Sequence, residues 1–155
     1  MHQSEPMTIL LIEDNPDHAE LIMDALREHH VQNEIIWEDT GEGGLDFLFG
    51  QGKHAGNPEQ VLPILVLLDI KLPGIDGLEV LKAIKENPRT TDIPVVMLTT
   101  SRQESEIIRS YRYHASSYIV KPINFTEFMD AIAGLKLYWN IATLPARRTP
   151  PPGDP

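Results

Sequence analysis

Apolar residues along the chain gather in five short runs, and longer segments with a helical repeat separate them. The runs are rich in branched residues and too short for core helices, which is typical of buried parallel strands. They lie at 7–12, 34–38, 64–68, 93–98 and 118–120. The longer segments carry apolar residues three and four positions apart, which predicts helices at 16–30, 40–49, 76–85, 104–113 and 125–141. Strands that alternate with helices predict an α/β domain, in which a five-stranded parallel sheet has helices on both faces.

The residues at several helix ends support these predictions. Asn15 can cap the first helix and Pro16 suits its first position, while Asn124 and Glu127 form a start like a capping box for the last helix. The glycines near residue 41 weaken the start of the second helix. The inward face of the first helix is expected to contain Ala19, Leu21, Ile22, Ala25 and Leu26, and that of the second Leu45, Leu48 and Phe49. The polar segment 51–61 predicts only a loop.

Length and composition indicate one domain with short ends. We expect a flexible N-terminus at 1–6, a domain at 7–142 and a Pro-rich flexible tail at 143–155. Hydrophobic residues make up 41% of the chain, which is enough for a packed core.

Charge and composition exclude several classes of partner and chemistry. The chain has 155 residues with 23 Asp and Glu against 13 Lys and Arg, so its formal net charge is −10. Long-range repulsion therefore disfavours nucleic acid and anionic membranes as direct partners. Since there is no cysteine, disulfides, thiol catalysis and Cys-ligated zinc are excluded. The N-terminus does not resemble a signal peptide and no apolar stretch approaches ~20 residues, so we expect a soluble, cytoplasmic protein.

Polar residues stand where four of the predicted strands end. Glu13 and Asp14 follow the first strand, Asp69 the third, Thr99 the fourth and Lys121 the fifth. In open α/β sheets, sites form outside the carboxyl ends of the strands. If these four strands are near neighbours, the five side chains converge on one pocket.

The converging groups suit metal-assisted phosphoryl transfer. Packed carboxylates repel one another, and this repulsion is relieved by the cation of Lys121 and by a hard divalent ion, of which Mg²⁺ fits Asp14 and Asp69 best. Taken singly, each group has an ordinary structural explanation, such as a capping turn for the acidic pair or a surface position for Lys121. Their conjunction at four strand ends is what favours the functional interpretation. The six histidines have no metal-ligand spacing, and no phosphate-binding glycine loop or nucleophile elbow is present.

These residues resemble the receiver domain of bacterial two-component response regulators. The matching features are Glu13-Asp14, the segment 69–77 (DIKLPGIDG), Thr99 and Lys121-Pro122, and the resemblance spans about residues 7–142. It implies a flavodoxin-like (βα)₅ fold in which Asp69 accepts a phosphoryl group from a sensor histidine kinase. It also implies that Asp14, Asp69 and the Lys71 backbone carbonyl bind Mg²⁺, with Glu13 acting mainly through water.

The same resemblance assigns a switch. Thr99 is implied to bind a phosphoryl oxygen in the active state, and Lys121 to neutralise the phosphoryl charge. Tyr118 occupies the aromatic switch position, whose side chain alternates between exposed and buried rotamers, and Pro122 is implied to follow a cis peptide bond. The sequence departs from the common pattern at Ser116-Ser117 and in a longer loop at 51–62.

Features outside the site resemble a narrower group, the single-domain regulators paired with phytochrome-type kinases. The features are the longer loop, the segment 99–101 (TTS) and the segment 137–141 (LYWNI) ahead of the Pro-rich tail. This resemblance implies a bacteriophytochrome as the kinase partner. Because no DNA-binding segment follows residue 142, we expect the output to be protein contact.

The last predicted helix suggests a second copy of the chain as a partner. Its stripe toward the sheet is expected to contain Phe125, Phe128, Ile132, Leu135 and Trp139, and the apolar residues off that stripe are Met129, Leu137, Tyr138 and Ile141. A wide core face would explain the second set. Apolar residues near the end of the helix favour instead a homodimer through it, which we expect.

Two other functions compete with the switch. A metal-dependent phosphohydrolase with an aspartyl nucleophile commonly needs a second Asp two residues later as general acid, where this chain has Lys71. A receiver-like interaction module without phosphoryl chemistry would be expected to lack Asp14, Asp69 or Lys121, and all three are present. The sequence therefore favours a phosphorylation switch rather than a metabolic enzyme.

Overall fold

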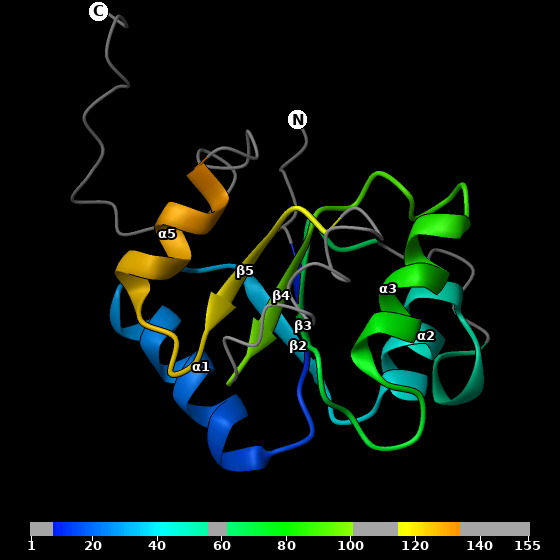
Figure 1. The fold of residues 1–155 in the computed structure, drawn as a ribbon, viewed down its shortest axis with the longest axis horizontal. Coiled ribbons are helices and arrows are strands. Elements are labelled where there is room, and N and C mark those ends of the chain that lie inside the picture. The colour runs from blue at the N-terminus through cyan, green and yellow to red at the C-terminus, as the bar shows by residue number, and fades with distance from the viewer. Residues whose placement is uncertain (1–7, 56–61, 101–114, 134–155) are drawn as a thin grey trace, which may run out of the picture.

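A computed structural model of the protein describes residues 8–55, 62–100 and 115–133. Five parallel strands form one sheet in the order β2-β1-β3-β4-β5 (Figure 1). The strands are β1 (Thr8–Ile12), β2 (Glu34–Glu38), β3 (Leu65–Asp69), β4 (Val95–Thr99) and β5 (Ser117–Val120). The helices are α1 (Pro16–Glu28), α2 (Gly41–Phe49), the short η1 (Gly52–His54), α3 (Gly77–Glu86) and α5 (Phe125–Ala133). The predicted fold class is confirmed, and each predicted strand lies within two residues of its observed position.

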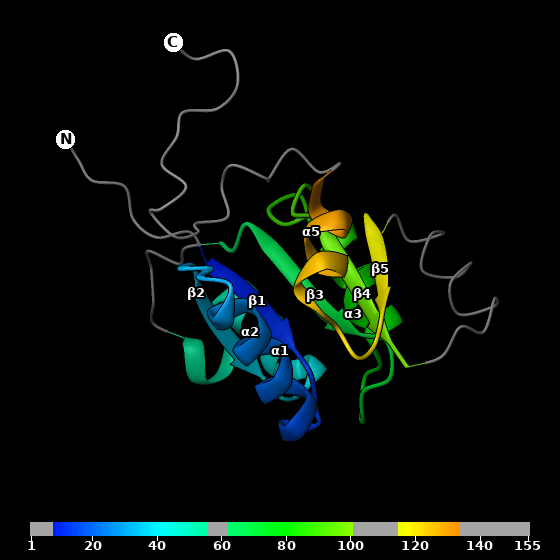
Figure 2. The same ribbon diagram turned by 90° about the vertical axis from the view of Figure 1, so that its left-hand side faces the viewer.

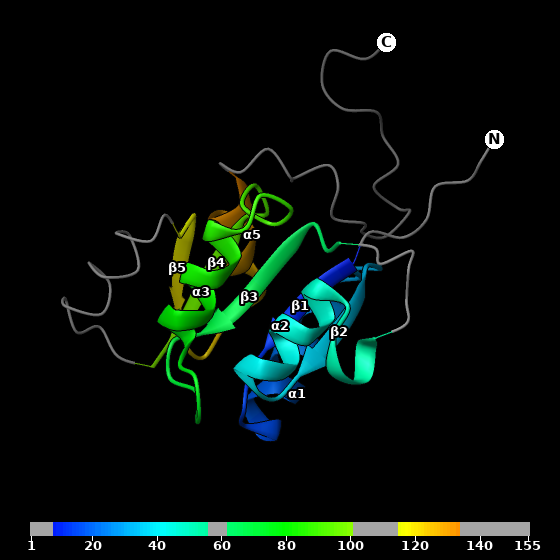
Figure 3. The same ribbon diagram turned by 90° about the vertical axis from the view of Figure 1, so that its right-hand side faces the viewer.

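The described helices cover the two faces of the sheet. Helices α1 and α5 lie on one face (Figure 2), and α2 and α3 lie on the other (Figure 3). Every residue of β1, β3 and β4 is buried, because side chains on both faces of these strands meet helices. This explains why their sequences are continuous apolar runs. Strand β2 lies at the edge and is only partly covered, with Trp37 37% exposed.

Side-chain caps fix where the helices begin. The Asn15 side chain accepts hydrogen bonds from the backbone N–H groups of Asp17 and His18, as the sequence predicts. Asp76 and Glu79 form a capping box at α3. Each cap sets a helix start beside the carboxyl end of the preceding strand, so the first turns of α1 and α3 flank the edge where the polar residues gather.

Glycines bring α2 close to its neighbours. The prediction that they weaken the start of this helix omits their packing role, since a Cβ at Gly44 would overlap the Ile12 side chain and one at Gly41 would meet Val80. The side chain of Thr40 caps the helix by accepting from the Gly43 N–H at 2.8 Å. The intrinsic cost of glycine in a helix is therefore offset by close contact with β1 and α3.

Several details differ from the sequence predictions. Leu21 was expected on the buried stripe of α1 but is 60% exposed, and Met129 was expected off the stripe of α5 but packs against the core. Helix α1 ends at Glu28, two residues early, because His30 adopts a left-handed conformation with φ 65°. The helix predicted at 104–113 and the end of the one predicted at 125–141 lie outside the described residues. No helix in the described part of the chain is long and apolar enough to cross a membrane.

The segment after α2, predicted only as a loop, is bound to the end of β2. Lys53 Nζ and His54 Nε2 lie 3.0 Å and 2.9 Å from the two carboxylate oxygens of Glu38, which is buried. The His54 ring also meets Phe47 edge-on, with 5.1 Å between ring centroids. These contacts hold the last residue of β2 in place beside the site.

Candidate functional site

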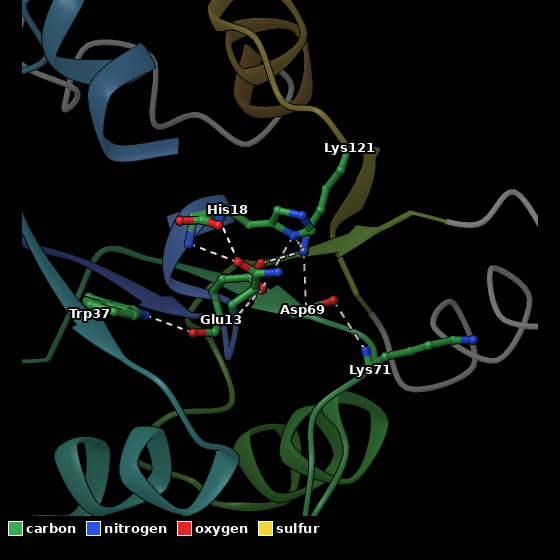
Figure 4. A network of polar contacts seen from close by, with 8 residues as sticks. Glu13, His18, Trp37, Asp69, Lys71 and Lys121 are labelled. Carbon is green, nitrogen blue, oxygen red and sulfur yellow. Dashed lines mark hydrogen bonds and ion pairs between the residues drawn. The ribbon is translucent and has the colours of Figure 1, made fainter. Parts of the chain in front are cut away.

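Three carboxylates meet at the carboxyl ends of β1 and β3. Oxygens of Glu13, Asp14 and Asp69 all lie within 4.8 Å of one another (Figure 4 labels two of these residues). The cause is the strand order, since β1 and β3 are paired neighbours and both run toward this edge. The predicted convergence is therefore present, with Glu13 and Asp69 buried and Asp14 exposed.

Lys121 reaches the same point from the end of β5. Its Nζ lies 3.2 Å from Asp69 Oδ2 and 2.5 Å from Glu13 Oε1, and its side chain is 7% exposed (Figure 4). The Lys121 backbone N–H donates to the Thr99 carbonyl at 2.7 Å, which ties this residue to the end of β4. The peptide bond between Lys121 and Pro122 is cis.

Glu13 is held by both its main chain and its side chain. The Trp37 indole N–H donates to the Glu13 carbonyl at 2.8 Å, and the Glu13 N–H donates to the Glu38 carbonyl at 3.0 Å. The Asn15 N–H donates to Glu13 Oε2 at 3.1 Å. Glu13 Oε1 is buried, and among the described residues its partner is the Lys121 ammonium, with which it forms an ion pair rather than a hydrogen bond.

Asp69 is held beside the first turn of α3. The Lys71 N–H donates to Asp69 Oδ1 at 3.3 Å, and the Gly77 N–H donates to the Ile70 carbonyl at 2.8 Å. A Cβ at Gly77 would overlap the Asp69 carbonyl oxygen, so only glycine allows this approach. Burial raises the pKa of Asp69 to about 7, even though Lys121 acts in the opposite direction.

The charge of the cluster suits a divalent cation. With all three acids ionised and Lys121 protonated, the cluster has two uncompensated negative charges. The cluster consists of oxygen donors alone, which suit hard cations such as Mg²⁺ or Mn²⁺. These residues therefore fit a divalent ion, which in such a site would offset the charge of a transferring phosphoryl group.

The predicted switch residues lie at or near this edge. Thr99 is the last residue of β4 and is 2% exposed. Tyr118 is half-buried on β5 and packs against the core cluster on the α2 and α3 face. Pro122 is exposed beside the cluster, and the Lys71 side chain points away from it in Figure 4.

His18 also belongs to this cluster, although its spacing from other histidines does not indicate a site. Its Nδ1 lies 3.2 Å from Lys121 Nζ. The available signal was position, since His18 stands in the first turn of a helix that begins just after the acidic pair. His18 also borders a cleft of about 190 Å³ beside the cluster, lined by His18, Leu21, Ile22, Thr100, Lys121, Pro122 and Ile123.

Comparison with known proteins shows the family to which the fold belongs. Residues 9–133 match the response regulator receiver domain. The chain belongs to this family. Phosphorylation on an aspartate is standard for receiver domains.

Similar receiver domains are known from other organisms. The probable methanogenesis regulatory protein FilR2 of Methanothrix harundinacea is 40% identical over 139 residues, which cover 90% of this chain and 87% of FilR2. The response regulator Rcp1 of Synechocystis sp. is 38% identical over 142 residues, or 91% of this chain and 95% of Rcp1. The structure of the bacteriophytochrome response regulator AtBRR superimposes with a TM-score of 0.82 at 42% identity, covering 91% of this chain and 99% of AtBRR. The Mn²⁺-bound form of Rcp1 gives a TM-score of 0.71 at 35% identity, covering 90% and 99%.

The raised pKa of Asp69 predicts that cation binding strengthens with pH. Below pH 7 the cation must displace a proton from Asp69, and above pH 7 the carboxylate is free. The apparent Kd for Mg²⁺ is therefore expected to fall about tenfold between pH 6 and pH 8. Fluorescence of Trp37, whose indole contacts Glu13, can follow the titration in a Trp139→Phe background.

The matched control is Asp69→Asn in the same background. This variant is expected to bind Mg²⁺ more weakly and with no comparable pH dependence over this range. Equal affinities at pH 6 and pH 8 in the parent protein would contradict the assignment, as would an undiminished pH dependence in Asp69→Asn.

Proposed function

We propose that Asp69 of this receiver domain accepts a phosphoryl group from the phosphohistidine of a sensor histidine kinase. The observation that carries the proposal is the convergence of Glu13, Asp14 and Lys121 on Asp69. An acceptor carboxylate needs cations at the point where phosphoryl charge arrives. The Lys121 ammonium lies 3.2 Å from Asp69, and the carboxylates of Glu13 and Asp14 lie close enough to help bind a metal cation.

The chemistry is a transfer between two residues. One oxygen of Asp69 attacks phosphorus, the P–N bond to the kinase histidine breaks, and the freed electron pair stays on the imidazole nitrogen. The product on this chain is an acyl phosphate. Lys121, which contacts Asp69 Oδ2 in the unphosphorylated protein, would move its hydrogen bond to a phosphoryl oxygen.

The divalent ion in this proposal is Mg²⁺. Asp14, Asp69 and the Lys71 backbone carbonyl would hold it, and Glu13 would act mainly through one of its waters. Bound there, the ion would supply positive charge at the transferring phosphoryl oxygens. A relative, Rcp1, has a Mn²⁺-bound form, which supports a divalent ion in this family.

The switch in this proposal runs from Thr99 to Tyr118. The Thr99 hydroxyl would bind a phosphoryl oxygen, and its movement would let the half-buried Tyr118 side chain pack inward. Strands β4 and β5 are paired and place Thr99 opposite Val120, two residues beyond Tyr118.

The position of Lys71 disfavours a phosphohydrolase. Lys71 stands where such an enzyme commonly has its general acid, and its side chain points away from the cluster (Figure 4).

The proposed kinase partner is a bacteriophytochrome. Support comes from AtBRR and from a second bacteriophytochrome response regulator, RtBRR, whose structure superimposes with a TM-score of 0.81 at 40% identity over 96% of this chain.

The cleft beside Lys121 is the proposed contact for this kinase. Asp69 is 6% exposed, so a phosphohistidine must come close to the cluster, and the kinase then covers its rim. Leu21 lines the cleft and is 60% exposed, and Ile123 and Pro122 line it from the segment after β5. An exposed apolar side chain beside an apolar cleft is typical of a protein contact.

The homodimer through the last helix stays a prediction. Met129 packs against the core, and the other residues that suggested the dimer, Leu137, Tyr138 and Ile141, lie outside the described residues. Light scattering over a concentration series is expected to show a mass that rises toward two chains. A mass that stays at one chain up to high micromolar concentration, with and without a phosphoryl mimic, would contradict it.

Phosphorylation at Asp69 can be tested without a kinase. Incubation with acetyl phosphate and Mg²⁺ is expected to add the mass of one phosphoryl group in intact-protein mass spectrometry, and acid or hydroxylamine treatment should remove it. Asp69→Asn should show no adduct, while Asp76→Asn, which changes an acid outside the cluster, should keep it. An adduct that persists in Asp69→Asn would refute the assignment.

If the kinase binds this cleft, a substitution there should slow phosphoryl transfer from the kinase but not from acetyl phosphate. Leu21→Ser removes an exposed apolar side chain and is expected to slow transfer from an autophosphorylated bacteriophytochrome kinase by about tenfold. Uptake from acetyl phosphate should stay unchanged, because Leu21 does not touch the carboxylates. The control is Glu28→Ser at the far end of α1. Equal transfer rates for Leu21→Ser and the parent protein would place the kinase elsewhere.

A further inference from the structure

The ammonium of Lys121 has a third neighbour besides the two carboxylates. His18 Nδ1 lies 3.2 Å from Lys121 Nζ, at hydrogen-bond distance, and 3.9 Å from Glu13 Oε2, beyond it (Figure 4). An ammonium has only N–H donors and no acceptor, so a hydrogen bond between the two requires the lone pair of Nδ1. This arrangement corresponds to the imidazole tautomer whose ring proton lies on Nε2.

We propose that His18 is a positioning residue for phosphoryl transfer to Asp69, which holds the Lys121 ammonium through a neutral acceptor. This inference rests on the proposed function of Asp69. Nothing in the catalytic chemistry requires a histidine at this place, and His18 touches neither Asp14 nor Asp69 in the described contacts. Its contact is with the lysine that both buried carboxylates share.

The need for such a residue follows from the two carboxylates. Lys121 Nζ is closer to Glu13 Oε1, at 2.5 Å, than to Asp69 Oδ2, at 3.2 Å. Two acids at unequal distances do not by themselves fix the position of a flexible lysine, and a third contact restricts it further. His18 stands on the first turn of α1, whose start is fixed by Asn15, and so offers a rigid third point.

Neutrality is what makes an imidazole suited to the task. A hydrogen bond from an ammonium to a neutral nitrogen is weaker than one to a carboxylate. His18 can therefore restrict the ammonium, within 3.2 Å of Asp69, in the resting protein and release it when a phosphoryl group arrives with its greater negative charge. An acid at residue 18 would compete with the phosphoryl group for Lys121.

A pair of substitutions isolates the acceptor. His18→Asn places its Oδ1 where the Nδ1 of histidine lies along the side chain, and His18→Leu has nearly the same shape as asparagine but no acceptor. The His18 side chain is 39% exposed, so neither change opens a cavity in the core. The control for histidine loss elsewhere is His30→Asn, at an exposed position after α1.

The first measurement uses the unphosphorylated protein. Hydrogen exchange of the Lys121 ammonium, observed by ¹⁵N NMR of the lysine side chains, is expected to speed up about tenfold in His18→Leu and to stay within twofold of the parent in His18→Asn. The second measurement is the rate of phosphoryl uptake from acetyl phosphate at saturating Mg²⁺. It is expected to fall about fivefold in His18→Leu and to stay within twofold in His18→Asn and His30→Asn.

The two measurements keep this inference separate from the proposed function. A parent protein that takes up no phosphoryl group refutes the role of Asp69, whereas the exchange measurement still tests the contact between His18 and Lys121. Parent-like uptake in His18→Leu overturns the inference. It is equally overturned by an equal loss in His18→Asn and His18→Leu, or by unchanged Lys121 exchange in His18→Leu.

Discussion

The buried ammonium of Lys121 holds two buried carboxylates, Glu13 and Asp69, together at one edge of the sheet. Without a cation, two such acids could not both ionise in a site from which water is largely excluded. Removing the lysine alone would leave buried charge unpaired, which typically costs about 3–5 kcal/mol. The arrangement of the strand ends, and the chemistry they support, both depend on this shared cation.

The same constraint links stability to function. Burial, together with the nearby Glu13, raises the pKa of Asp69 to about 7 against the opposing effect of Lys121. Because one ammonium cannot balance three ionised acids, the cluster also suits a divalent ion. In the proposed function, the cluster receives positive charge before a phosphoryl group arrives and holds that group afterwards. The acidity that is unfavourable in the resting fold would then serve the reversible phosphoryl switch.

The sequence was sufficient for the fold and for the residues at strand ends. Runs such as 64–68 are typical of buried strands, and parallel strands bring Glu13, Asp69 and Lys121 to the same edge of the sheet, close together where the strands are neighbours. The burial and the roles of side chains on the helices were harder to predict. Apolar spacing alone could not tell the exposed Leu21 from its buried neighbour Ile22, because both fit a wide stripe, and His18 acts through a lysine 103 residues away in the chain.

The proposed switch depends on the position that Lys121 Nζ takes when Asp69 carries a phosphoryl group. A crystal structure with Mg²⁺ and beryllofluoride, which mimics that group, measures this directly. Beryllium is predicted on an oxygen of Asp69, with Lys121 Nζ within hydrogen-bond distance of one fluorine and the Thr99 hydroxyl on another. Beryllofluoride bound away from Asp69, or Lys121 still paired with Glu13 beside an occupied Asp69, would contradict the account.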